Sequence, residues 1–478
     1  MGEESFVDLR VKRLCCGRGP ERTESEMRLT FVGHASVICE VGDVSLWSDP
    51  WLKGEAFNES WALYPQPILR DEDVARVTHV WISHEHPDHL SIPTIKALPT
   101  ERKARMVALF QKHYDTEVID WIRTQGFKEV RELPHAVWIE LSSTCRVVCY
   151  QVGHMDSALA IRGDGRTILN LNDCDTPAVT LRRLGRKMGH VDLLLDQFSV
   201  AGWCGNPEDV QRRRTAARGI LDKFVRDVEW INPDYVLPFA SFVRFSHEEN
   251  SYMNSSVNSL DDIAAKVDRS QLLVMYPGDV WSCEQGGVGD SEVAKSKYRR
   301  DWSEVATQPL KSHETCSMEK ILEAANRRIE DMQQKYQRWV LGRVPLVSFY
   351  VKDLGRAFVV DLRGGAKELE LPEAKCAVSL ASQAAWYTFA MRFGLPTLGV
   401  SGRFKINHSE PAFAALKKLG AAYSSGFYTK KAPRFGLGWR LCEFWWRRRR
   451  DVVSQFLRRI IVGATFDARR NAFVWSRM

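Results

Sequence analysis

Apolar and β-branched residues gather in short runs along the first part of the chain, and these runs predict buried β-strands. The clearest run, residues 77–82, is followed by a polar loop and then by residues 91–98. That last segment starts with a serine and carries a proline two positions later, which is typical of a helix start. Runs at 147–152 and 167–172 predict further strands. A strand, a loop and a helix in this order are typical of an α/β fold.

The pattern changes after this part. Residues 284–315 are polar and contain several glycines, which is typical of an insertion or a linker. Apolar positions recur with helical spacing over 316–340, and residues 345–380 alternate as strands do. We therefore predict a smaller α+β domain, in which the aromatic-rich segment 382–395 forms either core or a lid over a pocket.

The last residues form a strongly basic segment. Residues 430–478 contain 13 Lys or Arg and three acidic residues, whereas the whole chain carries a formal net charge of +7. Apolar residues between 444 and 461 fall at helical spacing, which predicts a basic amphipathic helix. Such a helix would bind an anionic membrane surface or an acidic partner, such as a ferredoxin or an acyl carrier protein. The alternative is a docked helix whose arginines are merely solvated.

Composition is ordinary for a globular protein, and it narrows the cellular setting. The 11 cysteines show no paired spacing, and no apolar stretch opens the chain. Both features favour a reducing cytoplasmic setting, with the basic segment allowing a peripheral place at a membrane surface. Nucleic acid is not expected as a partner, because no recognition motif accompanies the basic charge.

Four metal-binding side chains fall within six residues, directly after the strand predicted at 77–82. His84 and His86 lie two apart on an extended segment, so their side chains would point the same way and bind one ion. Asp88 and His89 would turn toward a second ion. Loops at the edge of a sheet are where ligand sites of α/β folds usually open. The sequence therefore predicts a two-metal site.

The HxHxDH spacing of this cluster resembles the signature of the metallo-β-lactamase superfamily. The segments 30–36 and 48–52 are similar to that superfamily as well. The resemblance implies an α/β fold of the αββα sandwich type, followed here by the smaller α+β domain. The expected division is an N-terminal extension over 1–26, the catalytic domain over 27–285, a linker and helix over 286–340, the small domain over 341–429 and the basic tail over 430–478.

The resemblance also implies further ligands. His154, at the end of a predicted strand, matches the third imidazole of the first ion, and Asp173, at the end of the next, matches a carboxylate that bridges both ions. Asp88 and Asp173 are then the carboxylates expected in catalysis. Four other residues are expected to contact substrate or to orient the ligands: His34, Asp49, Asp175 and Asp196.

The chain departs from the superfamily pattern at its last ligand. Where many members carry a histidine two residues past a proline, this chain has Ala240, and the nearest substitute is His247. This departure, together with residues 49–57 and 168–174, resembles the catalytic part of the cytidine monophosphate N-acetylneuraminate hydroxylase family. That resemblance implies a hydroxylase whose last metal ligand is His247.

Those hydroxylases carry a Rieske domain, whose cluster needs paired cysteine and histidine ligands. Here Cys15 and Cys16 are adjacent and no histidine precedes His34, so no Rieske cluster is expected in these residues. An oxygenase would then take its electrons from a separate reductase or ferredoxin.

Imidazoles and carboxylates suit iron, zinc and manganese alike, so the ligands leave the two metal ions open. With iron, which the hydroxylase resemblance favours, the chain is expected to be a non-haem diiron monooxygenase that hydroxylates a small-molecule or sugar-like substrate. With zinc or manganese it would hydrolyse an ester, a lactone or a phosphodiester. A binding protein with a degenerate site is the third alternative, because position 240 lacks the usual histidine.

Overall fold

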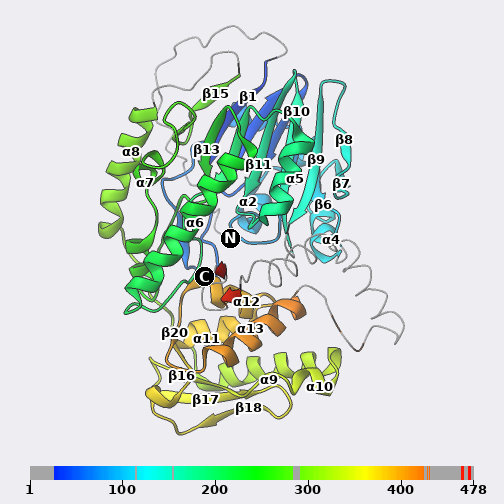
Figure 1. Cartoon of the computed structure of the whole chain (residues 1–478). Helices are drawn as coiled ribbons and strands as arrows, with labels where there is room; N and C mark the ends of the chain where they lie inside the picture. The colour runs from blue at the N-terminus through cyan, green and yellow to red at the C-terminus, as the bar shows by residue number, and fades with distance from the viewer. Residues whose placement is uncertain are drawn as a thin grey trace, which may run out of the picture.

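The larger part of the protein is built around two β-sheets that pack face to face (Figure 1). The computed structural model describes residues 26–113, 116–152, 155–283, 291–424, 428 and 430, together with the backbone of β21 (Thr465–Asp467) and β22 (Ala472–Val474). The amphipathic helix predicted between 444 and 461 lies outside these residues. Within the described part, no helix has both the length and the apolar character needed to cross a membrane.

The first sheet has seven strands, antiparallel from β15 to β3 and parallel from β3 to β7. In spatial order they are β15 (Val280–Ser282), β1 (Arg28–Gly33), β2 (Ser36–Val41), β3 (Val44–Ser48), β5 (His79–Ile82), β6 (Val107–Gln111) and β7 (Glu129–Leu133).

The second sheet has six strands, parallel from β13 to β11 and antiparallel from β11 to β8. In spatial order they are β13 (Tyr235–Phe239), β12 (Leu193–Gln197), β11 (Arg166–Asn172), β10 (Asp156–Gly163), β9 (Cys145–Val152) and β8 (Trp138–Glu140). A separate ribbon pairs β4 (Trp61–Leu63) with β14 (Val243–Phe245).

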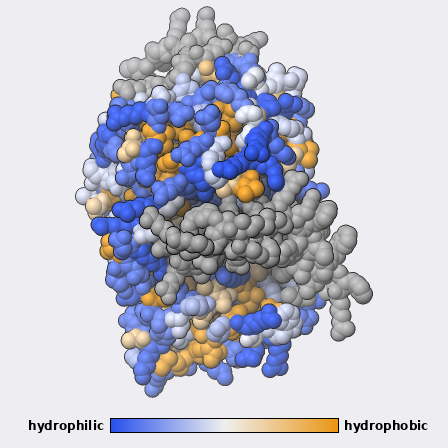
Figure 2. Space-filling model, viewed as in Figure 1, coloured by the Kyte–Doolittle hydropathy of each residue, from blue (hydrophilic) through white to orange (hydrophobic). Residues whose placement is uncertain are grey.

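Helices cover the outer faces of both sheets. The first sheet packs against α2 (Ile92–Ala97) and α4 (Glu117–Arg123), and the second against α5 (Ala178–Met188) and α6 (Val210–Ile231). The shorter helices around them are α1 (Asp71–Arg76), α3 (Thr100–Lys103), η1 (Ser251–Ser256) and α7 (Leu260–Ala264). This order of layers is the αββα sandwich that the sequence predicts. On the face shown in Figure 2, hydrophobic residues are interspersed among hydrophilic ones.

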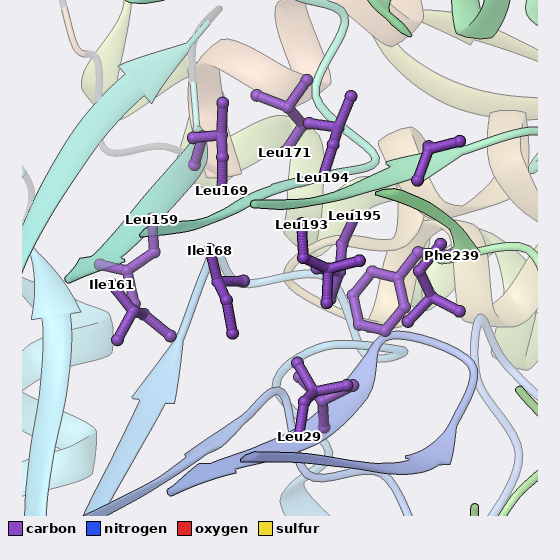
Figure 3. Close-up of a cluster of buried hydrophobic side chains, with 14 of the residues drawn as sticks. Leu29, Leu159, Ile161, Ile168, Leu169, Leu171, Leu193, Leu194, Leu195 and Phe239 are labelled. Atoms are coloured by element: carbon purple, nitrogen blue, oxygen red, sulfur yellow. The ribbon is translucent and has the colours of Figure 1, made fainter. Parts of the chain in front are cut away.

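Both faces of the second sheet are buried, and successive side chains along its strands point to opposite faces. On β11 and β12, Leu169 and Leu194 point to one side of the second sheet, while Ile168 and Leu193 point to the other side, toward Leu29 of the first sheet (Figure 3). Successive strand side chains face opposite ways, so a strand covered on both faces reads as a continuous apolar run.

A smaller α+β unit follows, as the sequence predicts, and lies at the bottom of Figure 1. Its five-stranded sheet runs β18 (Gly365–Leu369), β17 (Arg356–Asp361), β16 (Val347–Val351), β19 (Val378–Leu380) and β20 (Lys405–Ile406). Its helices are α9 (Met318–Lys335), α10 (Arg338–Leu341), α11 (Ser382–Ala390), α12 (Gly394–Ser401) and α13 (Glu410–Ser424). The aromatic-rich segment 382–395 contributes Phe389 and Leu395 to the core of this unit, which favours core over lid.

One segment differs from the sequence prediction. The polar stretch 284–315 is predicted as an insertion or a linker without a helix, but it contains α8 (Ser291–Glu304). This helix is held by Tyr298, whose ring stacks on Phe242 with a centroid distance of 4.8 Å and whose hydroxyl donates to the Met275 carbonyl oxygen. Apart from Tyr298, the apolar contacts of the helix come from few residues, among them Ala294 and Trp302, so its sequence shows little apolar periodicity and the pattern misses the helix.

Candidate metal centre

The predicted ligands gather where the strands of the two sheets end. Asp49 follows β3, and the segment from Ser83 to His89 follows the parallel strand β5. Asp173 follows β11 of the opposite sheet, and His34 lies in the turn between β1 and β2. The two sheets therefore bring separate segments of sequence to one edge of the sandwich.

One group of potential ligands consists of His84, His86 and Asp173. Nε2 of His84 lies 2.8 Å from Nδ1 of His86 and 3.7 Å from Oδ2 of Asp173. Nδ1 of His84 faces the Ser83 hydroxyl at 3.0 Å, so its Nε2 is left for an ion. Burial lowers the pKa of His84 to about 3, which keeps the imidazole neutral as a metal ligand requires.

A second group consists of His34, Asp88 and His89, all of them buried. Oδ2 of Asp88 lies 3.3 Å from Nε2 of His34 and 3.4 Å from Nε2 of His89. Burial disfavours the charged carboxylate, but the neighbouring His89 and His34 lower the pKa of Asp88 to about 2. The group therefore offers an ionised carboxylate between two imidazoles.

Asp173 connects the two groups. Its Oδ2 lies 3.5 Å from Nε2 of His89 in the second group, as well as 3.7 Å from His84 in the first. Burial opposes its ionisation, yet His84 and His89 hold the pKa of Asp173 well below its usual range. An ionised carboxylate between both groups is the arrangement expected of a bridging ligand.

The 2.8 Å between His84 and His86 is a hydrogen-bond distance, but the separations that involve Asp88 and Asp173 fit shared metal ions better than hydrogen bonds. Separations of 3.3 to 3.7 Å exceed the usual hydrogen-bond length of about 2.7–3.2 Å. Ligands on a tetrahedral ion with bonds of about 2.0–2.1 Å lie about 3.4 Å apart. Four buried atoms of these two groups have no hydrogen-bond partner within the described part of the chain: His34 Nδ1, Asp88 Oδ1, His89 Nε2 and Asp173 Oδ1. Such unpaired polar atoms are costly unless an ion or water satisfies them, so the residues present fit a metal pair.

Asp49 holds His89 through the ring nitrogen that faces away from the other ligands. Its Oδ2 lies 2.9 Å from Nδ1 of His89 and accepts from the Asn172 amide at 2.7 Å. Its Oδ1 accepts from the Ser83 backbone N–H at 2.8 Å. A carboxylate that holds one imidazole nitrogen fixes the other nitrogen toward a metal. Burial disfavours protonated His89, but Asp88, Asp173 and Asp49 raise its pKa well above its usual value.

Sequence reasoning missed Asp156 at the start of β10. Its Oδ1 lies 4.0 Å from Nε2 of His84, and its side chain is 24% exposed. Burial raises the pKa of Asp156 well above its usual range, and the Asp173 and Glu85 carboxylates add to the effect. Asp156 lies two residues after His154, the predicted third imidazole, and this spacing could have indicated it as a site residue. His154 itself lies outside the residues that the structure describes.

His247 is not grouped with the other predicted ligands. Its ring is buried, its Nδ1 accepts from the Glu249 backbone N–H at 3.1 Å, and its Nε2 has no partner in the described part of the protein. Burial, with Arg403 adding to it, lowers the pKa of His247 to about 3. Its surroundings belong to the contact with the smaller unit rather than to the centre around Asp88.

Two other predicted site residues also lie apart from the ligands. Asp175 is exposed and makes no hydrogen bond to the imidazoles of the described part of the centre. Asp196 is fully buried and pairs with Lys223 at 2.9 Å, so its carboxylate faces a lysine rather than the ligand groups. Burial, with Asp227 adding to it, raises the pKa of Asp196 to about 7. Asp49 thus has the orienting contact that the sequence suggests for Asp175.

With this geometry in view, the chain was compared with known proteins. Residues 28–194 match a family model. Its description is Beta-lactamase superfamily domain. This match runs from β1 to the start of β12 and includes Asp49, the HxHxDH cluster and Asp173. The resemblance to this superfamily, and the fold that it implies, are confirmed for this part of the chain.

Curated relatives reach further along the chain. A protein of Asterias rubens named cytidine monophosphate-N-acetylneuraminic acid hydroxylase is 26% identical over 352 residues, which are 69% of this chain and 50% of that protein. The protein of the same name from Mus musculus is 28% identical over 297 residues, which are 57% of this chain and 48% of that protein. The chain spans about half the length of the curated relatives it matches.

Solved structures were compared as well. CmlA, a diiron beta-hydroxylase from Streptomyces venezuelae, aligns with a TM-score of 0.37 and 18% identity over 55% of each chain. Igni18, a metallo hydrolase from Ignicoccus hospitalis, aligns with a TM-score of 0.38 and 17% identity over 54% of this chain and 98% of its own.

Proposed function

We propose that this chain is a dinuclear-metal enzyme that hydroxylates a small, sugar-like substrate. The observation that carries the proposal is the pair of ligand groups joined by Asp173, in a chain whose curated relatives are named hydroxylases. His84, His86 and Asp173 would hold one ion, with His154 as the predicted further ligand. Asp88, His89 and Asp173 would hold the other. The relatives are named for cytidine monophosphate-N-acetylneuraminic acid, which favours an anionic sugar nucleotide as the class of substrate.

The residues of the centre divide into a closed and an open side. His34, Asp88 and His89 are buried, whereas His86 and Asp173 are partly exposed. Substrate would therefore approach from the side of His86 and Asp173. The buried side excludes water and fixes the imidazoles through Asp49, which limits the reorganisation that the reaction requires.

Two iron ions held here would supply oxygen activation and the redox chemistry of hydroxylation. Electrons would come from a separate reductase or ferredoxin. The role of this chain's own residues is to keep His84 neutral, to keep Asp88 and Asp173 ionised, and to leave the face beside His86 open.

A hydrolase is the second candidate, and one observation favours it. The ligand separations of 3.3 to 3.5 Å around Asp88 and His89 match a tetrahedral ion. A six-coordinate ion with similar bonds would place neighbouring ligands about 3.0 Å apart. Zinc prefers the tetrahedral arrangement, and a zinc pair would suit hydrolysis of an ester, a lactone or a phosphodiester.

Metal content distinguishes the two functions. The full chain should be purified without oxygen from iron-supplemented cells, analysed for metals, and followed by visible absorption with dithionite and then O₂. The hydroxylase predicts about two irons per chain and a spectrum that responds to both reagents. Stoichiometric zinc and a silent spectrum would overturn it and move the search to ester and phosphodiester substrates.

A matched pair of variants separates the centre from adventitious binding. His84→Ala should lower the metal content. His190→Ala should leave it unchanged, because His190 is exposed and belongs to a group with Asp234 and the buried Asp192, and Arg166 already pairs with Asp192.

A further inference from the structure

We infer that His34 is the last imidazole ligand of the second metal ion, in place of the histidine that is missing at position 240. This inference rests on the proposed dinuclear centre and adds a ligand that the sequence pattern does not assign. The sequence offers His247 for this role, and the geometry points to His34 instead.

The His34 ring lies beside Asp88 and His89, which are the proposed ligands of the second ion. Its Nε2 lies 3.3 Å from Oδ2 of Asp88, and the His34, Asp88 and His89 ligand atoms all lie within 4.8 Å of one another. The His34 and His89 rings are 5.8 Å apart between centroids and inclined at 60°. Imidazoles that share one ion converge on it through their nitrogens rather than stacking, so this arrangement fits a common ion.

The His34 ring is buried, and one of its nitrogens lacks a hydrogen-bond partner in the part of the chain that the structure describes. His34 is 1% exposed, and its Nδ1 has no hydrogen-bond partner among the described residues. Among the described residues, the polar atom close to its Nε2 is Oδ2 of Asp88, at a distance longer than a good hydrogen bond. A histidine kept only for packing would leave this polarity uncompensated, whereas a ligand nitrogen is satisfied by the ion.

A backbone hydrogen bond joins His34 to Ala240. The Ala240 backbone N–H donates to the His34 carbonyl oxygen at 3.0 Å. The turn after β1 and the segment after β13 therefore meet at this point. A histidine side chain at either position would begin near the same side of the centre. His34 can therefore supply the imidazole that a histidine at position 240 would have supplied.

The backbone at both positions supports a functional role. His34 has a φ of 46° and Ala240 a φ of 46°, in the left-handed region that non-glycine residues rarely adopt. Such conformations are strained and gather at binding and catalytic sites. His34 is further fixed by Trp51, whose ring meets it edge to face at 5.4 Å.

The test compares metal stoichiometry across four forms of the full chain: the wild type, His34→Asn, His247→Ala and the double variant His34→Asn with Ala240→His. Asparagine tolerates the left-handed backbone at position 34, so His34→Asn removes the imidazole with little added strain. Each form is loaded with Co²⁺, and bound metal is measured by elemental analysis and by the visible absorption of the cobalt.

We expect the wild type and His247→Ala to bind two ions. His34→Asn should keep the first ion and bind the second at least tenfold more weakly, with loss of part of the cobalt absorption. The double variant should recover the second ion, because the new imidazole enters beside the same side of the centre. A folding defect in His34→Asn would show as a change in the far-ultraviolet circular dichroism and would not be repaired at position 240.

Two results overturn the inference. One is a His34→Asn variant that binds both ions with wild-type affinity. The other is loss of the second ion in His247→Ala alone. A wild type that binds no ion, or only one, would instead overturn the dinuclear centre itself, so the two failures are distinguishable.

Discussion

At the scale of single residues, the centre depends on contacts behind the ligands as much as on the ligands. Asp49 is fully buried and contacts His89, Ser83 and Asn172. One carboxylate thus fixes an imidazole of the centre, the start of the ligand loop and the end of β11. Its left-handed backbone, with a φ of 40°, adds to the strained positions gathered around the centre.

Replacing Asp49 should therefore weaken metal binding without touching a ligand. Asp49→Asn removes the charge that holds Nδ1 of His89 and brings a second amide N–H group toward Asn172. We expect metal affinity to fall by about 10- to 100-fold, as measured by competition with a chelator. Asp175→Asn is the control, because this carboxylate is exposed and should leave the affinity unchanged. Equal affinities for both variants and the wild type would contradict the role of Asp49.

The spacing of residues along the chain predicts only the local part of this centre, whereas the remote residues Asp173, His34 and Asp49 are expected from the superfamily resemblance. His84, His86, Asp88 and His89 lie on one short loop, so their spacing alone indicates metal binding. The contact of His34 with Asp88 spans 54 residues of sequence and depends on how two loops meet. The same applies to the contact of Asp49 with His89, which spans 40 residues. No local pattern records such contacts.

At the scale of elements, strands buried on both faces are predicted best. The apolar run 77–82 becomes β5, and the runs near 147 and 167 become β9 and β11, because continuous burial leaves a continuous apolar run. The ribbon of β4 and β14 escapes prediction, because each strand has three residues and its partner lies about 180 residues away. Short strands gain their stability from distant pairing, not from their own sequence.

β5 also carries a buried histidine whose titration should affect stability. Burial lowers the pKa of His79 to about 4, whereas an unfolded chain would protonate it near its ordinary value of 6.5. Between these two values the unfolded state binds a proton that the folded state does not. The contribution of His79 to the free energy of unfolding is therefore unaffected above pH 6.5 and falls as the pH drops toward 4.

His79→Gln should remove this loss. Relative to the wild type, its free energy of unfolding should fall less between pH 7.5 and pH 5, by about 1 kcal/mol after allowance for screening by solvent. Urea unfolding at several pH values measures the difference. Parallel pH profiles for the two proteins would show that His79 titrates alike in the folded and unfolded states.

At the scale of the whole molecule, the smaller unit reaches toward the metal centre. Arg403, which is 1% exposed, donates to Glu249 Oε2 at 3.0 Å and to the Asn58 carbonyl oxygen at 2.9 Å. Asn58 lies in a run of three left-handed residues from Phe57 to Glu59, with φ values of 54°, 57° and 61°. The Phe57 ring lies 5.8 Å from the His86 ring. Arg403 therefore holds a strained loop against a ligand of the centre.

Loss of Arg403 should destabilise both the contact between the two units and this loop. Arg403→Met keeps the volume but leaves Glu249, which is buried at the contact, without its closest cation, and we expect a loss of about 3–5 kcal/mol in the free energy of unfolding. Hydrogen exchange of the backbone amides from 56 to 61 should become faster, because three left-handed residues persist only while their surroundings hold them.

The matched control is Arg212→Met, which removes another arginine that joins the two units. Arg212 pairs with Glu410 at 2.8 Å, but both side chains are about a quarter exposed. Exposed pairs contribute about 1 kcal/mol or less, so this variant should lose little stability and keep slow exchange at 56 to 61. If both variants lost the same small amount and exchange near Phe57 stayed slow, the loop would be held by the larger domain alone. Faster exchange in Arg403→Met only would make the smaller unit a structural part of the metal centre.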